Sequence, residues 1–303
     1  MGIVIDRIGK SYKKLKALED ISIEVRSGEL FGLIGPDGAG KTTLFRILTT
    51  LILPDTGHAS VAGYDVIEQY REIRKHVGYM PGRFSLYQDL TVAENLNFFA
   101  TIFGTTIAEN YDLIKDIYVQ IEPFKDRRAG KLSGGMKQKL ALSCALIHRP
   151  RVLFLDEPTT GVDPVSRKEF WEMLKRLQEK GITILVSTPY MDEAELCDRI
   201  ALIADGKILE INRPGTIMDS FPKKIYNVRA SETYRLIQDL KTYPKTHSVY
   251  PFGEYLHFIS NEDSFKSDEL IQYLAQKGHV QIEVLGTKPT IEDSFMELSR
   301  SAR

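Results

Sequence analysis

The chain has 303 residues and a formal net charge of −1, with 43% hydrophobic and 27% charged residues. This is the composition of an ordinary globular protein, and the length suits one large domain with a smaller one. The near-neutral charge and the lack of a polybasic block exclude a large electrostatic footprint for nucleic acid. The two cysteines, Cys144 and Cys197, have neither disulfide nor metal-binding spacing and suit a reducing compartment.

Neither a signal peptide nor a membrane-spanning segment is predicted. The first residues lack the basic segment, apolar core and cleavage site of a signal peptide, and no stretch approaches the roughly 20 apolar residues that cross a bilayer. The longest apolar candidate, Leu44 to Leu53, is interrupted by Arg46. We therefore expect any membrane role to act through a partner.

The N-terminal part is predicted to contain strands followed by a strand–loop–helix unit. Within the first 27 residues or so, Ile21, Ile23 and Val25 alternate with polar residues, which indicates a half-buried strand. Residues 30–34 are continuously apolar, as in a strand covered on both faces. A glycine-rich loop follows, and a helix is expected to begin near Lys41.

Residues from about 86 to 149 are predicted to be mainly helical, with helices at 92–103 and 107–121 and another that begins at Ser133. Residues 151–155 and 182–186 read as buried strands, joined by a helix that carries Phe170, Trp171, Leu174 and Leu177. This alternation predicts a mostly parallel sheet with helices on its faces.

The pattern changes after about residue 220. A strand at 225–228, a helix at 233–240, a hairpin of 248–252 with 255–259, a helix at 270–275 and a strand at 280–285 give the order β-α-β-β-α-β. A last helix is expected at 291–298. The sequence thus predicts a large domain at 1–220 and a small α+β, ferredoxin-like domain at 221–303.

The glycine-rich loop fits the phosphate-binding pattern G-x-x-x-x-G-K-[ST]. Glycines keep side chains away from the backbone N–H groups that surround a phosphate, and the start of a helix adds its positive dipole end. Lys41 can contact the β- and γ-phosphates of ATP, and the Thr42 hydroxyl can bind Mg²⁺. The predicted nucleotide-binding residues here are Gly35, Pro36, Asp37, Gly38, Ala39, Gly40, Lys41, Thr42 and Thr43.

An adjacent pair of carboxylates follows the second buried strand. Asp156 ends that strand, where it can hold a water of Mg²⁺, and Glu157 can polarise the attacking water. The sequence therefore predicts an ATPase with Glu157 as its catalytic residue.

These residues, together with Leu132, Ser133, Gly134, Gly135 and Met136, resemble the nucleotide-binding subunit of an ATP-binding cassette (ABC) transporter. The resemblance covers residues 1 to about 215. It implies a P-loop NTPase core with an antiparallel β subdomain and a helical subdomain at about 86–149.

The same resemblance implies further roles. The segment 132–136 is the ABC signature, which acts on the ATP of a second subunit in a head-to-tail pair. Tyr12 holds the place of the aromatic residue that stacks on adenine, and Asp163 lies in the loop that meets the partner subunit. Residues 84–96 resemble the segment that touches an integral membrane permease. The sequences of residues 159–164 and 291–295 are similar to those of ATP-binding subunits of bacterial drug and polysaccharide exporters. We therefore expect a cytoplasmic subunit on the inner face of the cell membrane.

Two positions depart from the family pattern. Gly82 stands where the family has a glutamine, and Pro189 stands where it has the switch histidine that hydrogen-bonds the γ-phosphate. Proline has neither a polar side chain nor a backbone N–H. The sequence therefore predicts an impaired ATP site, paired with a complete sister ATPase in a heterodimer.

Three alternatives stay open from the sequence. The chain could be an ordinary hydrolytic ABC homodimer in which both departures are tolerated. It could be an ATP-gated scaffold that does not hydrolyse ATP. It could also be an ABC protein of DNA repair or the ribosome, which the short interval from Lys41 to Leu132 and the single cassette disfavour.

Overall fold

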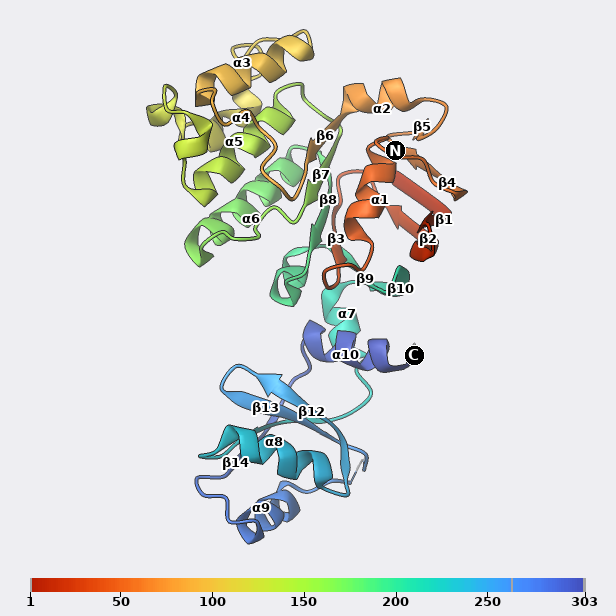
Figure 1. Ribbon diagram of the computed structural model, residues 1–303, viewed down its shortest axis with the longest axis vertical. Coiled ribbons are helices and arrows are strands. Elements are labelled where there is room, and N and C mark those ends of the chain that lie inside the picture. The colour runs from red at the N-terminus through yellow and green to blue at the C-terminus, as the bar shows by residue number, and fades with distance from the viewer. Residues whose placement is uncertain (1, 263, 302–303) are drawn as a thin grey trace. The chain divides into compact units, whose positions relative to one another are not determined.

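The computed structural model describes residues 2–262 and 264–301, which divide into two compact units (Figure 1). The first unit comprises the residues up to Pro214 and those from Leu298 on, and the second spans Gly215–Glu297. The division thus falls before Gly215, whereas the sequence analysis places it after residue 220. Each unit has its own hydrophobic core, and the two are described separately.

A six-stranded sheet in the order β10-β9-β3-β8-β7-β6 forms the centre of the first unit. Its strands are β3 (Leu30–Ile34), β6 (Val77–Met80), β7 (Val152–Asp156), β8 (Thr183–Thr188), β9 (Arg199–Ala204) and β10 (Lys207–Asn212). All neighbours run parallel except β10, which pairs antiparallel with β9. Every residue of β3, β7 and β8 is buried, as expected for strands covered on both faces.

Helices cover this sheet. They are α1 (Lys41–Leu48), α2 (Tyr70–His76) and α6 (Pro164–Glu179), with the short 3-10 helix η3 (Met191–Leu196) after β8. Phe45 of α1 meets Phe154 of β7 edge-on, with ring centroids 5.7 Å apart. Because both rings are fully buried, this contact packs the middle of α1 against the middle of β7.

The helical part consists of α3 (Val92–Ile102), α4 (Tyr111–Tyr118) and α5 (Gly134–Leu146), with 3-10 turns η1 (Glu122–Phe124) and η2 (Ala129–Lys131). The helix predicted at 107–121 is therefore shorter than expected. Its start is displaced because the Asn110 amide donates to the Thr105 hydroxyl and to the carbonyl of Ile147, which holds the preceding residues in a turn.

An antiparallel sheet in the order β2-β1-β4-β5 completes the first unit. Its strands are β1 (Ile3–Tyr12), β2 (Leu15–Val25), β4 (Thr56–Val61) and β5 (Tyr64–Asp65). The sequence analysis located the first two strands and missed β4 and β5, as it missed β6, α2, β9 and β10. Most of the missed segments are short and carry no long run of alternating or continuous apolar residues, whereas residues 200–204 of β9 form an apolar run that was overlooked.

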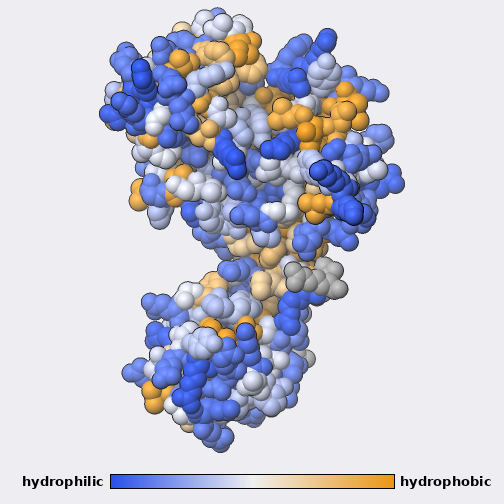
Figure 2. Space-filling view, viewed as in Figure 1, coloured by the Kyte–Doolittle hydropathy of each residue, from blue (hydrophilic) through white to orange (hydrophobic). Residues whose placement is uncertain are grey.

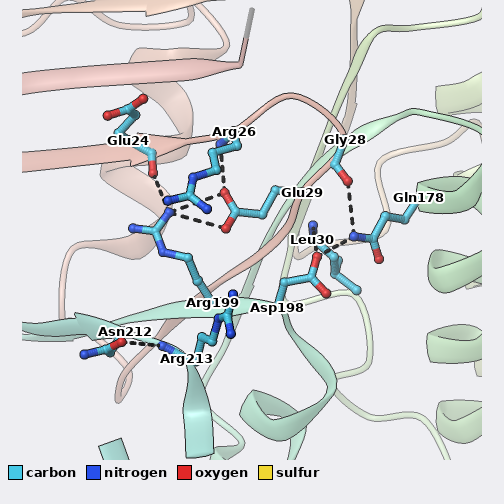
Figure 3. Close-up of polar contacts among 10 residues, drawn as sticks. All are labelled: Glu24, Arg26, Gly28, Glu29, Leu30, Gln178, Asp198, Arg199, Asn212 and Arg213. Carbon is cyan, nitrogen blue, oxygen red and sulfur yellow. Dashed lines mark hydrogen bonds and ion pairs between the residues drawn. The ribbon is translucent and has the colours of Figure 1, made fainter. Parts of the chain in front are cut away.

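A polar network joins β3 and β9 at the end of the sheet where both strands begin (Figure 3). Asp198 accepts from the backbone N–H of Leu30 at 3.0 Å and also contacts Gln178, whose amide donates to the carbonyl of Gly28 at 3.1 Å. Beside it, Arg199 lies 3.3 Å from the carboxylate of Glu29. This end of the sheet is therefore closed by internal contacts, which leaves the opposite end, at the carboxyl ends of the strands, for a ligand.

The second unit contains a four-stranded antiparallel sheet in the order β12-β13-β11-β14. Its elements are α7 (Pro214–Asp219), β11 (Ile225–Arg229), α8 (Thr233–Thr242), β12 (Thr246–Phe252), β13 (Tyr255–Ser260), α9 (Ser267–Gln276) and β14 (Glu283–Thr287). The terminal helix α10 (Ile291–Ser301) follows. From β11 to β14 the elements follow the order β-α-β-β-α-β, with β13 between β11 and β12, which is the split β-α-β arrangement of ferredoxin-like domains.

Candidate nucleotide-binding site

The glycine loop joins the end of β3 to the start of α1. Gly38 and Gly40 have φ angles of +81° and +104°, which side chains other than glycine rarely adopt. A Cβ on Gly40 would stand 2.5 Å from the carbonyl oxygen of Ala17, and one on Gly35 would stand 2.1 Å from that of Ile203. These positions therefore require glycine, and the loop keeps its backbone N–H groups free of side chains.

Lys41 begins α1 and is only 3% exposed. Its ammonium donates to the carbonyls of Gly35 at 2.8 Å and Pro36 at 3.0 Å, and lies 3.1 Å from Oε1 of Glu157. Among the described residues, no side chain caps the N-terminus of α1, and no acidic residue lies in its first turn. The buried cation and the uncapped helix start together form a site that fits a phosphate.

A cavity of about 420 Å³ opens beside this loop. Of the residues predicted from the sequence, seven line it: Tyr12, Gly38, Gly40, Lys41, Thr42, Thr43 and Glu157. Tyr12 is 42% exposed, so its ring is available to a ligand. Gly35, Pro36, Asp37 and Ala39 belong to the same loop but are not part of the cavity wall.

Five residues that sequence reasoning missed complete the wall: Leu15, Lys16, Ala17, Asp205 and Gly206. The turn between β9 and β10 reaches the loop because the N–H of Gly206 donates to the carbonyl of Ala39 at 3.2 Å. The carbonyl of Gly206 in turn accepts from the N–H of Glu19 on β2 at 2.8 Å. No sequence signal marks these contacts, since they depend on which strands pair.

The two adjacent carboxylates lie at the end of β7. Asp156 is 2% exposed, and its Oδ1 accepts from the hydroxyl of Ser187 on β8 at 2.6 Å. Glu157 has φ +51°, a left-handed conformation that costs on the order of 1–3 kcal/mol in a non-glycine residue. Nearby, burial and then the charge of Asp156 raise the pKa of Tyr79 to about 12. The strained turn directs the Glu157 carboxylate to Lys41.

The residues present fit an Mg²⁺–nucleotide complex. Thr42 lies in the cavity wall next to Lys41, and Asp156 offers a buried carboxylate at the carboxyl end of β7. Oxygen donors of these two types are those that Mg²⁺ uses when it is held mainly by phosphates. When bound, Mg²⁺ would neutralise charge on the β- and γ-phosphates.

Gly82 and Pro189 follow β6 and β8, the two strands that lie on either side of β7 in the sheet. A Cβ on Gly82 would stand 3.0 Å from the carbonyl oxygen of Asp156 and 3.8 Å from the Cβ of Glu157. Pro189 follows Thr188, the last residue of β8, two positions after the Ser187 that contacts Asp156. Neither residue can donate a side-chain hydrogen bond to a ligand in this site.

Comparison with known proteins gives the same family. The sequence profile described as "ABC transporter" matches residues 18–160. The chain is 34% identical over 301 residues to a Nod factor export ATP-binding protein I of Burkholderia thailandensis, covering 98% of this chain and 96% of the relative. The chain belongs to the ATP-binding proteins of ABC transporters.

Other relatives agree. A probable multidrug ABC transporter ATP-binding protein, YbhF of Escherichia coli, is 37% identical over 287 residues, although the chain spans only 49% of its length. A solved ATP-binding subunit of an ABC transporter is 28% identical, with a TM-score of 0.66, over 73% of this chain and 93% of that chain. A dimeric bacterial ABC transporter cassette, MJ0796, is 25% identical, with a TM-score of 0.63, over 70% of this chain and 98% of that chain.

In this ABC cassette the signature segment lies apart from the cavity. Ser133 is exposed and caps α5, with its hydroxyl accepting from the N–H of Met136 at 3.4 Å. A Cβ on Gly135 would stand 2.8 Å from the hydroxyl of Ser166 on α6. Leu132 is buried and anchors the segment, while Gly134 is exposed. None of these residues lines the chain's own nucleotide cavity.

Asp163 caps α6, and its carboxylate accepts from the N–H of Ser166 at 3.0 Å. The hydrogen bonds from Ser166 hold the pKa of Asp163 below its usual value. The predicted partner-facing loop is thus fixed at the start of α6, beside the signature glycines.

Glu193 is a buried residue of this region that sequence reasoning missed. It is 1% exposed and accepts hydrogen bonds of 2.6 Å from the hydroxyls of both Thr159 and Thr188. Arg167 of α6 lies 3.6 Å from the same carboxylate. Glu193 therefore ties the loop after Glu157 to the end of β8. The acidic residue alone gave no signal, because an isolated Glu is usually on the surface.

The segment 84–96 leads into α3. Apolar residues are visible over α3 at the top of Figure 2, and Tyr87, Phe98, Ile102 and Phe103 are 51%, 37%, 59% and 38% exposed. Among the described residues, none of the helices is long and apolar enough to cross a membrane. An exposed apolar group of this kind is typical of a surface that contacts another protein.

Proposed function

We propose that this chain is the ATP-binding subunit of an exporter whose own ATP site is impaired and whose signature completes the site of a sister ATPase. The observation that carries the proposal is that Gly82 and Pro189 follow the two strands on either side of β7, the strand that ends at Asp156. Two groups that would contact a reacting phosphate are missing from one site, while the residues that hold the nucleotide remain.

The binding part of the cycle rests on Lys41. ATP entering the cavity would replace the carbonyls of Gly35 and Pro36 and the carboxylate of Glu157 around the ammonium. This releases Glu157, which can then accept a proton from the attacking water. Tyr12 would stack on the adenine ring at the mouth of the cavity.

The hydrolysis step of the cycle is slowed, because Gly82 and Pro189 supply no side-chain donor to the reacting phosphate. Removing one oriented donor to a developing charge commonly lowers the rate on the order of 10²–10³-fold, and effects within one site need not add. We therefore infer durable ATP binding with slow hydrolysis. The exposed residues Ser133 and Gly134 would contact ATP held by the sister subunit, where the complete site turns over.

The export role is supported by the relatives, which are described as multidrug and Nod factor export ATP-binding proteins. Closure of the ATPase pair would move the segment 84–96 and α3 against a membrane permease on the inner face of the membrane. The exposed apolar side chains on α3 supply a contact surface for such a partner.

The test compares the purified chain with Glu157→Gln. We expect both proteins to bind ATP and to remain monomeric in sedimentation with ATP, and the Glu157→Gln substitution to lower an already small turnover only slightly. Brisk hydrolysis that Glu157→Gln abolishes, together with ATP-dependent dimers of the chain alone, would support the ordinary hydrolytic homodimer instead. That alternative is favoured by the retention of Glu157 beside Lys41.

A further inference from the structure

A second cavity, of about 440 Å³, lies between α6 and η3, and its wall includes the ion pair of Arg167 and Glu193 described above. Trp171, Pro164 and Leu196 supply apolar surface to its wall. Leu196 is 42% exposed and lies on η3, while Trp171 is 3% exposed and lies on α6. The volume and the largely apolar wall are typical of sites for small organic ligands.

One buried donor of this wall is unsatisfied: Nε1 of Trp171 has no hydrogen-bond acceptor among the described residues. Two cations of the wall are already paired, because Arg167 lies 3.6 Å from Glu193 and Lys175 lies 3.2 Å from Asp198. Lys168, also in the wall, is exposed, and its ammonium has no carboxylate partner in the part of the chain that the structure describes. Since buried donors usually have acceptors, a molecule that brings an acceptor into this region would remove a free-energy cost.

The acidic groups of the wall limit how much negative charge a ligand can carry. Glu193 is occupied by Thr159 and Thr188, and Asp192 pairs with Arg167 at 3.8 Å. Glu172 lies in the same wall and repels anions. A polyanion such as a nucleotide is therefore disfavoured, and one anionic group beside Lys168 is the charge that the wall can accept.

We infer that the cavity between α6 and η3 binds a small, planar, apolar molecule with a single anionic group, of the aromatic carboxylate or sulfonate type. The apolar part lies against Trp171 and Leu196, and the anionic group lies near Lys168.

The cavity is connected to the switch strand. Glu193 belongs to its wall and accepts from Thr188, the residue before Pro189. The guanidinium of Arg167 lies over the ring of Tyr190, the residue after Pro189, at 4.3 Å from its centroid. A molecule that displaces Arg167 or η3 therefore alters the contacts that hold Thr188 and Tyr190 on either side of Pro189. Binding in this cavity would thus change the conformation at the end of β8.

The test uses intrinsic fluorescence, because Trp171 is the single tryptophan of the chain. The probe is 1-anilinonaphthalene-8-sulfonate, added to the full chain without nucleotide. We expect saturable 1:1 energy transfer from Trp171 to the probe. Leu196→Glu, which places a carboxylate at the rim, should weaken binding at least about tenfold because the charge must be desolvated.

Leu53→Glu is the matched control, since Leu53 is 62% exposed in the same unit and lies outside this cavity. It should bind the probe like the unmodified chain, and circular dichroism should show both variants folded. Lys168→Gln should weaken the sulfonate several-fold and leave the uncharged parent, N-phenyl-1-naphthylamine, unaffected.

Each of the following results would overturn the inference. They are the absence of saturable transfer, equal binding by Leu196→Glu and Leu53→Glu, and equal affinity for the charged and uncharged probes. A change of sedimentation coefficient in Leu196→Glu alone would also overturn it, because the cavity would then be an interface between copies. Since no nucleotide is present, these outcomes are independent of the proposed ATPase function.

Discussion

Replacement of Pro189 by histidine tests the impaired site directly. The segment is held on both sides, because the Thr188 hydroxyl donates to Glu193 at 2.6 Å and accepts from the N–H of Tyr190 at 3.1 Å. An imidazole at position 189 would therefore start from a fixed backbone at the carboxyl end of β8, two residues after the Ser187 that contacts Asp156.

One oriented donor is worth on the order of 10²–10³ in rate, or about 2.7–4 kcal/mol. We expect less from Pro189→His, because position 82 still lacks its amide. An increase of about tenfold to 10²-fold in steady-state ATP turnover corresponds to about 1.4–2.7 kcal/mol. The assay is phosphate release by the purified chain at saturating Mg²⁺–ATP.

Two controls separate the imidazole from a change of backbone. Pro189→Ala removes the proline ring in the same way but adds no imidazole, so it should leave ATP turnover unchanged. Pro189→His combined with Glu157→Gln should return to the low rate of the unmodified chain. The reasoning is refuted if the unmodified chain already turns over rapidly, or if Pro189→Ala and Pro189→His give the same increase.

Three further predictions follow from buried or strained positions. Gly40→Ala should lower the unfolding free energy by about 1–3 kcal/mol and abolish ATP binding, because Gly40 has φ +104° and a Cβ there would stand 2.5 Å from the Ala17 carbonyl oxygen. Thermal unfolding measures the first effect and nucleotide titration the second. Glu193→Ala should cost about 3 kcal/mol in urea denaturation, because the buried hydroxyls of Thr159 and Thr188 lose their acceptor, and a loss below 1 kcal/mol would contradict the network. Burial alone would raise the pKa of Asp293, but hydrogen bonds from His257 and from Thr290 and Tyr250 outweigh it and leave the pKa below 3.8. This carboxylate therefore stabilises the second unit above about pH 3.8 and loses that contribution as the pH falls through its folded pKa. Asp293→Asn should remove part of the acid sensitivity seen in denaturation below about pH 3.8.

The elements with local signals were predictable. The helix that begins at Lys41 follows from the glycine loop, and the buried strands β3, β7 and β8 follow from continuous apolar runs. The order β-α-β-β-α-β of the second unit follows from turns and periodicity. Short segments such as β4 and β5 were missed because their partners, not their own sequences, hold them in strands. The strand β9 was overlooked although residues 200–204 form a continuous apolar run.

The sequence by itself determined which chemical groups the protein carries: a phosphate loop, Asp156 with Glu157, a signature segment, and the substitutions Gly82 and Pro189. These are encoded by residue type and short spacing, which covalent geometry preserves in any fold of the chain. Only the tertiary structure decided that Asp205 and Gly206 line the nucleotide cavity. It also decided that Glu193 joins the loop after Glu157 to the end of β8, through Thr159 and Thr188. Those contacts join residues far apart along the chain, and they exist because β9 pairs with β3 and β8 lies beside β7, a choice made by the packing of the whole sheet.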